Sequence, residues 1–293
     1  MKTFFVPAHI TGFFEICSNT QTLMSGSRGA GIVLSSGVET CVKAREAEDN
    51  QIKVFVNGKA SPQHMTTISV IKKILEYTGK VSSVEIRHSH ELSEAMGFGL
   101  SASMAIGAAL GLNHALRLNL DLKELGGFAH LAEIENQTGL GDVSAEFSKG
   151  LVIRLVEGAP GIGKIKSIPF EEYNIITFLV GGPIYTKNIL KDHKNRQVIN
   201  YMGKSCFDAL LKKPTPERFL ELSKKFTLET NLAQNKVKNV ILSLENQGIV
   251  ASMCMLGNAV FTLTKKPEKI KEMLDFPSIV SEPLKESFIS SGL

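Results

Sequence analysis

The sequence predicts an α+β fold. Segments with alternating or continuous apolar residues, which are typical of strands, are mixed along the 293 residues with segments whose apolar residues recur at helical spacing. The two kinds do not follow the strict strand–helix–strand alternation of a doubly wound sheet. A hydrophobic content of 43% and a charged content of 21% are ordinary for a globular protein, and the length suffices for one large domain or two medium ones.

The first half of the chain carries both kinds of segment. The predicted strands are short and apolar, at residues 2–6, 30–44, 52–56, 81–87 and 151–156. The third of them ends at Asn57-Gly58, a dipeptide that is the strongest short-range hairpin signal. The predicted helices cover residues 65–77, 100–116 and 121–137. The first stops at Gly79, and the last begins at Asp121 with Glu124 in the capping-box position.

The second half begins with a turn-rich stretch at residues 157–163, which is the best candidate for a domain boundary or a hairpin. Strands are predicted beyond it at residues 175–180, 249–255 and 259–264. Helices are predicted at residues 188–211, 216–228 and 235–246, and the last of them ends at Gly248.

Charge and cysteine usage argue against several functional classes. The net charge of +4 is mild and no basic run stands out, so nucleic acid is not the expected partner. The cysteines lie far apart without a CxxC pair, which argues against a zinc site or a disulfide scaffold and fits a reducing cytoplasm. The N-terminus lacks the features of a signal peptide, and the longest apolar stretch, residues 104–112, is too short to span a membrane.

A glycine-rich segment at residues 94–104 is the most informative part of the chain. Gly97 and Gly99 allow the backbone to come close to a ligand, and the helix that follows presents free N–H groups and a positive dipole end. Such a site suits a phosphate, which the hydroxyls of Ser101 and Ser103 can bind directly or through Mg²⁺. The alternative is a glycine turn before a buried helix.

Residues 158–165 nearly match the phosphate-binding pattern GxxxxGK[ST]. Ile165 stands where the pattern needs a hydroxyl, and the residues after it, up to Pro169, do not predict a long helix. We therefore expect a glycine hairpin here.

Asp142 follows a glycine turn, Gly139-Leu140-Gly141, and is a candidate general base toward a hydroxyl substrate. It is also a candidate N-cap, because a short helical pattern follows it.

Further candidates lie on either side of Asp142. His130 and Glu133 share one face of the preceding helix, where Glu133 can bind Mg²⁺ and His130 an anionic substrate; a structural role is the alternative for both. Arg154 lies on an apolar strand and needs a partner, either a substrate carboxylate or a structural ion pair. Ser27, in a glycine-rich segment read as a loop, is a candidate for a small anion site.

Taken together and in this order, these segments resemble the GHMP kinase superfamily. The residues Gly97-Phe98-Gly99-Leu100-Ser101-Ala102-Ser103 are similar to its central glycine–serine motif, although Leu100 replaces the first serine. Residues 7–14, 26–31, 129–133, 138–143, 158–161 and 255–258 complete the match, and within the superfamily they are most similar to the kinases that act on pantoate in archaea. The third motif, at residues 255–258, is poorer in glycine than in most members.

The resemblance implies a two-domain kinase with a ribosomal-S5-like N-terminal domain (residues 1–158) and a ferredoxin-like C-terminal domain (residues 159–293). It implies ATP and Mg²⁺ as cofactors and pantoate as the small-molecule substrate, phosphorylated on its primary hydroxyl to 4-phosphopantoate in coenzyme A synthesis. The implied roles are catalysis for Asp142, Glu133 and Ser103, metal binding for Glu133 and Ser103, ATP binding for Gly97, Phe98, Gly99, Leu100, Ser101 and Ala102, and substrate binding for Ser27, His130 and Arg154.

Two alternatives stay open at this point. The acceptor can be another hydroxy acid or alcohol of the superfamily, such as shikimate, homoserine or mevalonate. The altered serine pair and the glycine-poor third motif also leave room for a member that binds a metabolite without catalysis. A homodimer, a cytoplasmic location and the lack of a membrane partner are further expectations.

Overall fold

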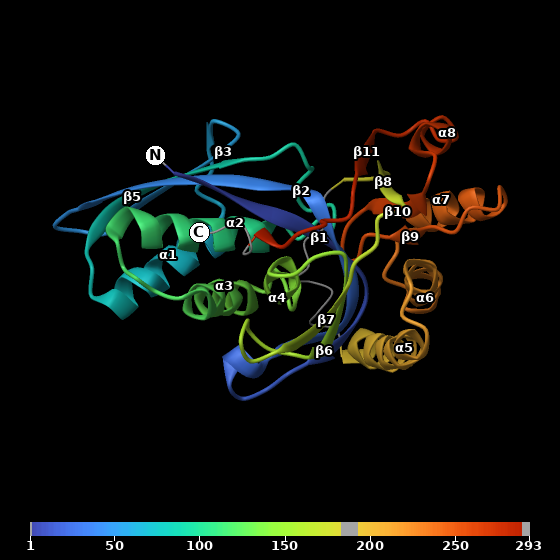
Figure 1. The fold of residues 1–293 in the computed structure, drawn as a ribbon, viewed down its shortest axis with the longest axis horizontal. Helices are drawn as coiled ribbons and strands as arrows, with labels where there is room; N and C mark the ends of the chain where they lie inside the picture. The colour runs from blue at the N-terminus through green and yellow to red at the C-terminus, as the bar shows by residue number, and fades with distance from the viewer. Residues whose placement is uncertain (1, 183–192, 289–293) are drawn as a thin grey trace.

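The computed structural model describes residues 2–182 and 193–288, and it confirms the predicted α+β fold. A seven-stranded sheet has the order β4-β3-β5-β2-β6-β7, with β1 paired to β2, and a four-stranded sheet has the order β11-β8-β10-β9 (Figure 1). The strands of the larger sheet are β1 (Thr3–Cys17), β2 (Gly26–Glu46), β3 (Gln51–Val56), β4 (Lys59–Ala60), β5 (Ser82–Ser89), β6 (Leu151–Val156) and β7 (Lys164–Ile168). Those of the smaller sheet are β8 (Asn174–Leu179), β9 (Ser252–Met253), β10 (Ala259–Thr264) and β11 (Ser278–Ser281).

The helices divide in the same way between the two halves of the molecule (Figure 1). The first group is α1 (Met65–Thr78), α2 (Leu100–Leu116), α3 (Leu122–Asn136) and the short α4 (Asp142–Glu146), and the second group is α5 (His193–Lys212), α6 (Pro216–Glu229), α7 (Asn235–Glu245) and α8 (Pro267–Lys271). A single 3₁₀ turn, η1 (Thr22–Met24), precedes β2.

Helix α2 packs directly on β2 because its residues are small. A Cβ added at Gly107 would lie 2.3 Å from Thr40 Oγ1, and one added at Gly111 would lie 2.4 Å from Val42 Cγ2. Only glycine permits this approach at the two positions. Helices α1 and α3 pack against α2 and against each other, so most of α2, from Leu100 to Leu112, is buried.

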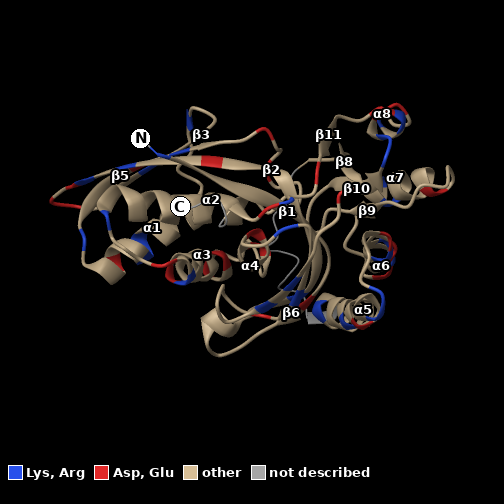
Figure 2. Cartoon of the chain, in the orientation of Figure 1, with Lys and Arg blue, Asp and Glu red and all other residues tan. Residues whose placement is uncertain are grey.

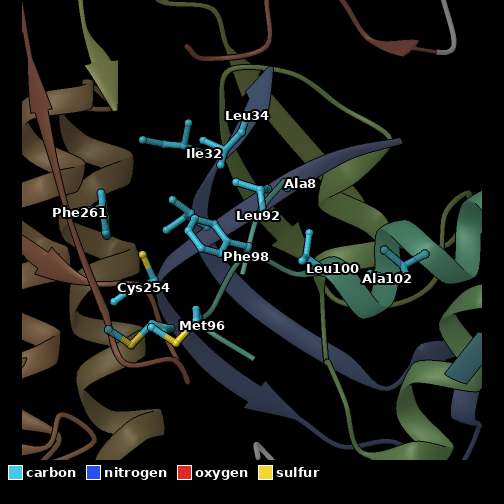
Figure 3. Close-up of a cluster of buried hydrophobic side chains, with 14 of the residues drawn as sticks. Ala8, Ile32, Leu34, Leu92, Met96, Phe98, Leu100, Ala102, Cys254 and Phe261 are labelled. Atoms are coloured by element: carbon cyan, nitrogen blue, oxygen red, sulfur yellow. The ribbon is translucent and has the colours of Figure 1, made fainter. Parts of the chain in front are cut away.

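Strand β1 joins the two halves. Its Phe13 and Phe14 rings pack against Phe219 and Phe226 of α6, with Phe14 and Phe226 centroids 5.6 Å apart. Figure 3 shows a second contact between the halves, in which Phe98 of the glycine-rich segment lies near Cys254 of the C-terminal half. The N-terminal end of α2 therefore lies at the junction of the two halves.

Most predicted elements are confirmed with small shifts, including the hairpin at Asn57-Gly58, the helix that begins at residue 100 and the strand at residues 259–264. Asp121 forms the predicted capping box with Glu124, since each side chain binds the backbone N–H of the other's residue. The prediction that residues 158–163 form a hairpin is also confirmed, because β6 and β7 pair antiparallel across them. Residues 188–192 of a predicted helix lie outside the described residues.

The first predicted strand is wrong in length. The sequence indicated a strand at residues 2–6 followed by a loop, whereas β1 continues to Cys17. Pro7 is compatible with a strand here because β1 pairs with β2 and with no other described strand, and an edge strand tolerates proline. The pairing of β1 with β2 shifts register twice, between Pro7 and His9 and between Thr11 and Phe13, which lets the strand continue past these positions.

Other differences are smaller. Residues 26–29, which precede the strand predicted at residues 30–44, already begin β2, and the predicted strand at residues 249–255 contains only the two-residue β9. The elements β7, β11 and α8 were not predicted. The division after residue 158 stays a prediction; the larger sheet itself extends to Ile168 through β7. None of the helices described in residues 2–182 and 193–288 combines the length and the apolar character needed to cross a membrane.

Candidate active site

A cavity of about 820 Å³ opens at the N-terminal end of α2. Segments distant in the sequence form its wall: β1, β2, the start of α1, the glycine-rich segment, the α3–α4 turn, β6 and the turn between β9 and β10. The sequence-predicted residues on this wall are Ser27, Gly97, Phe98, Gly99, Leu100, Ser101, Asp142 and Arg154.

The glycine-rich segment has the backbone shape that the sequence predicts. Gly97 and Gly99 have φ values of 89° and 67°, in the left-handed region that favours glycine. Gly99 caps α2 without a side-chain bond, and the first hydrogen bond of the helix runs from Ala102 N to Gly99 O at 2.9 Å. The amides of Leu100 and Ser101 precede that bond, so they are donors for an anion at the positive end of the helix dipole.

Asp142 is the first residue of α4, which lies between α3 and β1 (Figure 1), and Figure 2 shows acidic residues on this helix. Its Oδ1 lies 2.8 Å from His9 Nδ1 and 3.5 Å from Thr11 Oγ1, and its side chain is 21% exposed. Burial alone raises the pKa of Asp142, but the hydrogen bond from His9 and the nearby charge of Arg154 outweigh burial and hold the pKa below its ordinary value. Asp142 is therefore a carboxylate at neutral pH.

His9 is buried, and burial lowers its pKa although the bond to Asp142 opposes the change. A neutral imidazole beside a carboxylate must donate, so Nδ1 carries the hydrogen. Its Nε2 has no hydrogen-bond partner among the described residues. The histidine thus orients one carboxylate oxygen of Asp142, a residue that lines the cavity.

Glu133 lies directly behind the cavity wall and is 2% exposed. Thr138 donates to its Oε1 at 2.6 Å, and Oε2 has no partner within the described part of the chain. Burial raises the pKa of Glu133 to about 7, which the bond from Thr138 and the nearby hydroxyl of Ser101 oppose. An unpaired, buried carboxylate oxygen next to a helix N-terminus is suited to a cation.

Arg154 is 2% exposed, and its Nε donates to Ser27 O at 3.3 Å. Its Nη1 has no partner among the described residues, although the residue lines the cavity. Burial lowers the pKa of Arg154 and the charge of Asp142 opposes this, but a guanidinium stays protonated at any ordinary pH. The cavity therefore holds a desolvated cation with an unused donor.

Comparison with known proteins identifies the family. Residues 65–150 match the family model for the GHMP kinases N terminal domain. A pantoate kinase of Methanocaldococcus jannaschii is 35% identical to this chain over 283 residues, which cover 96% of the chain and 97% of that protein. The chain belongs to the pantoate kinase family of the GHMP kinases.

Two further relatives agree with this assignment. A pantoate kinase of Thermococcus kodakarensis is 32% identical over 92% of the chain and 90% of that protein. A solved structure described as a phosphotransferase related to the CoA biosynthesis pathway is 30% identical, with a TM-score of 0.86, over 97% of this chain and 96% of its own. The match to the pantoate kinase family thus extends over both halves of the fold.

Some residues assigned from the family resemblance do not reach the cavity. Ser103 is buried and donates to Pro7 O at 3.2 Å, and its role in metal binding stays a prediction. The Nε2–H of His130 donates to Ser25 O, 2.9 Å away, so His130 supports the start of β2 rather than lining the wall. Ala102 is also buried and off the wall.

Helix geometry explains why one serine lines the cavity and the other does not. Ser101 and Ser103 are two residues apart, so their side chains point in directions that differ by about 200°. Only Ser101 reaches the wall. Of these two serines, Ser101 is the one that lines the cavity, and its role in ligand binding stays a prediction.

Sequence reasoning missed two buried residues. His9 was noticed only as part of a segment read as a loop, and Glu146 was not singled out at all. Glu146 is 0% exposed, both of its oxygens lack a partner among the described residues, and a Cβ added at Gly99 would lie 2.8 Å from its Oε1. Burial and the charges of Asp142 and Glu133 raise its pKa well above the ordinary value, so its ionised form is disfavoured beneath the loop. In the sequence, Glu146 could have been noticed because it follows Asp142 by four residues, which places both on one face of a helix.

The glycine-poor third motif supports the glycine-rich segment through its backbone. A Cβ added at Gly257 would lie 2.0 Å from the carbonyl carbon of Met96, and one added at Gly97 would lie 2.7 Å from Cys254 O. The two turns are therefore in direct backbone contact, which leaves Met255 and Leu256 on the cavity wall.

Proposed function

We propose that this protein is an ATP-dependent pantoate kinase, which transfers the γ-phosphoryl group of ATP to the primary hydroxyl of pantoate. The observation that carries the proposal is one cavity that combines a helix N-terminus, the Asp142 carboxylate and the unused donor of Arg154. The two curated relatives named pantoate kinase support the choice of acceptor. The product, 4-phosphopantoate, would enter coenzyme A synthesis.

The triphosphate of ATP is proposed to bind at the N-terminal end of α2. The amides of Leu100 and Ser101 would donate to phosphate oxygens there, and the glycines at 97 and 99 permit the close approach. Phosphoryl transfer relies mainly on positioning and on neutralisation of charge, which this end of the helix supplies.

Mg²⁺ is proposed to bind between Glu133 and Ser101. The unpaired Oε2 of Glu133, with the Ser101 hydroxyl near the same carboxylate, provides the oxygen ligands that this cation prefers. When bound, the cation would neutralise negative charge on the phosphates.

The acceptor is proposed to bind with its carboxylate toward Arg154 and Ser27 and its primary hydroxyl toward Asp142. Asp142 would take the hydroxyl proton as the oxygen attacks the γ-phosphorus, the bond to the β–γ bridging oxygen would break, and ADP would leave. The proton would pass to solvent after the product departs. His9 would hold Asp142 in the orientation that this transfer needs.

ADP release measured across a panel of acceptors tests the proposal. With ATP and Mg²⁺ present, pantoate should give the highest kcat/KM, ahead of shikimate, homoserine and mevalonate at equal concentration. A higher value for another acceptor would move the assignment to that substrate. Nucleotide binding without turnover on any acceptor would favour the non-catalytic alternative.

Substitution of His9 should separate orientation of Asp142 from binding. In His9→Leu the hydrogen bond to Asp142 is lost, so kcat should fall by roughly 10- to 100-fold while the KM for ATP changes little. Because that bond lowers the pKa of Asp142, its loss should move the acid limb of the kcat/KM profile to higher pH.

His9→Asn provides the matched comparison, since an amide nitrogen can replace Nδ1 as the donor. It should recover part of kcat and return the acid limb toward lower pH. Equal losses in both variants with an unmoved acid limb would mean that His9 only fills space.

The homodimer, the cytoplasmic location and the lack of nucleic-acid and membrane partners stay predictions, as does the boundary after residue 158. The boundary is proposed on the family resemblance alone. Sedimentation of the purified protein would give its oligomeric state.

A further inference from the structure

The cavity wall near Asp142 has an apolar part that the proposed chemistry does not use. Phosphate, metal and carboxylate binding use polar residues of the wall, but apolar side chains also line the cavity, among them Phe14, Leu140, Met255 and Leu256. They come from β1, the α3–α4 turn and the turn between β9 and β10.

Contacts link these side chains to the acceptor-binding end. Met255 N donates to Thr11 O at 3.1 Å, and Thr11 Oγ1 is 3.5 Å from Asp142 Oδ1. Leu140 precedes Gly141, and a Cβ added at Gly141 would lie 2.7 Å from Arg154 Nε. Met255 and Leu140 thus belong to segments that lie next to the carboxylate base and the guanidinium.

Leu256 has an unusual backbone conformation for its residue type. Its φ is 63°, where glycine is normally found and where the family motif is usually rich in glycine. Glycine would adopt this backbone conformation with less strain than leucine. The close contact of Gly257 with the backbone of Met96 holds the turn in place, and Leu256 lines the cavity.

We propose that Leu256, together with Met255, Phe14 and Leu140, forms an apolar wall that selects acceptors with a methyl-substituted carbon between the hydroxyl and the carboxylate. This inference rests on the proposed function, because pantoate carries two methyl groups on that carbon. An unsubstituted hydroxy acid would make the same polar contacts but leave the wall facing water. One methylene in an apolar pocket changes kcat/KM by about 10- to 200-fold, so the wall is sufficient to discriminate.

The test compares pantoate with 2,4-dihydroxybutanoate, which has the same hydroxyls and carboxylate but lacks the two methyl groups. The unsubstituted protein should prefer pantoate by at least about 10-fold in kcat/KM. In Leu256→Ala this ratio should shrink several-fold, chiefly through loss with pantoate, while the KM for ATP is unchanged.

Leu256→Gly is the second variant, since glycine suits a φ of 63° and keeps the turn folded. It should lose the same discrimination as Leu256→Ala. The control is Leu242→Ala, an exposed leucine of α7 outside the cavity, whose acceptor ratio should match that of the unsubstituted protein.

An unchanged ratio in both Leu256 variants would overturn the inference. So would an equal loss with both acceptors accompanied by a higher KM for ATP, because Leu256 would then contact the nucleotide. Failure of the proposed function is a separate result, seen as no turnover of pantoate by the unsubstituted protein.

Discussion

Asp142→Asn is expected to reduce kcat by about 10²- to 10⁴-fold, the usual contribution of a general base. The amide is the same size as the carboxyl group and can still accept the hydrogen from His9 Nδ1 through its oxygen. It cannot accept a proton from the acceptor hydroxyl at neutral pH. ATP binding, measured by calorimetry, should change by no more than a few-fold.

Asp208→Asn is the matched control, because Asp208 is exposed on α5 and lies outside the cavity. Its kcat and melting temperature should equal those of the unsubstituted protein. If Asp142→Asn kept more than a tenth of the activity, the proton would have another acceptor, and the assignment of the base would be wrong.

The sequence was sufficient for the elements whose signals are local. The helix at residue 100 follows two glycines, and the helix at residue 122 follows a complete capping box, so both were predicted with their starts nearly correct. The prediction for strand β1 was too short because its proline, histidine and glycine are residues typical of a loop. Pairing with β2 over residues 3–17 outweighs those local preferences, and this pairing cannot be seen in the segment itself.

The site shows the same division between local and distant information. The glycine-rich segment, Asp142 and Arg154 were recognisable from their residue types and neighbours, and all of them line the cavity. His9 gains its role from a contact with a residue 133 positions away, and Glu146 from burial beneath a distant loop. Ser103 was assigned from a motif, but its direction on the helix takes it to Pro7 instead of the cavity.

Arg154→Ala should have the second large effect, and the effect should depend on the acceptor. Arg154 is buried and its Nη1 has no hydrogen-bond partner among the described residues, so a substrate carboxylate would form a desolvated charge pair with it. Loss of one partner of such a pair costs about 2–5 kcal/mol, or roughly 30- to 4000-fold in kcat/KM for pantoate. Most of the loss should appear in the KM for pantoate, because the carboxylate is distant from the reacting hydroxyl.

The decisive comparison uses a neutral analogue of pantoate in which a hydroxymethyl group replaces the carboxylate. The unsubstituted protein should use this triol poorly, and Arg154→Ala should use it no worse. The loss from removing the carboxylate and the loss from removing the guanidinium would then not be additive. Arg28→Ala provides the control, since Arg28 is bound to Glu15 by a pair outside the cavity and should leave the ratio of the two acceptors unchanged. Arg154→Lys should give an intermediate KM, because it keeps the charge without the planar fork. Equal losses for pantoate and the triol in Arg154→Ala would show that the guanidinium stabilises the cavity wall and does not bind the substrate. Another cation would then have to select the carboxylate of the acceptor.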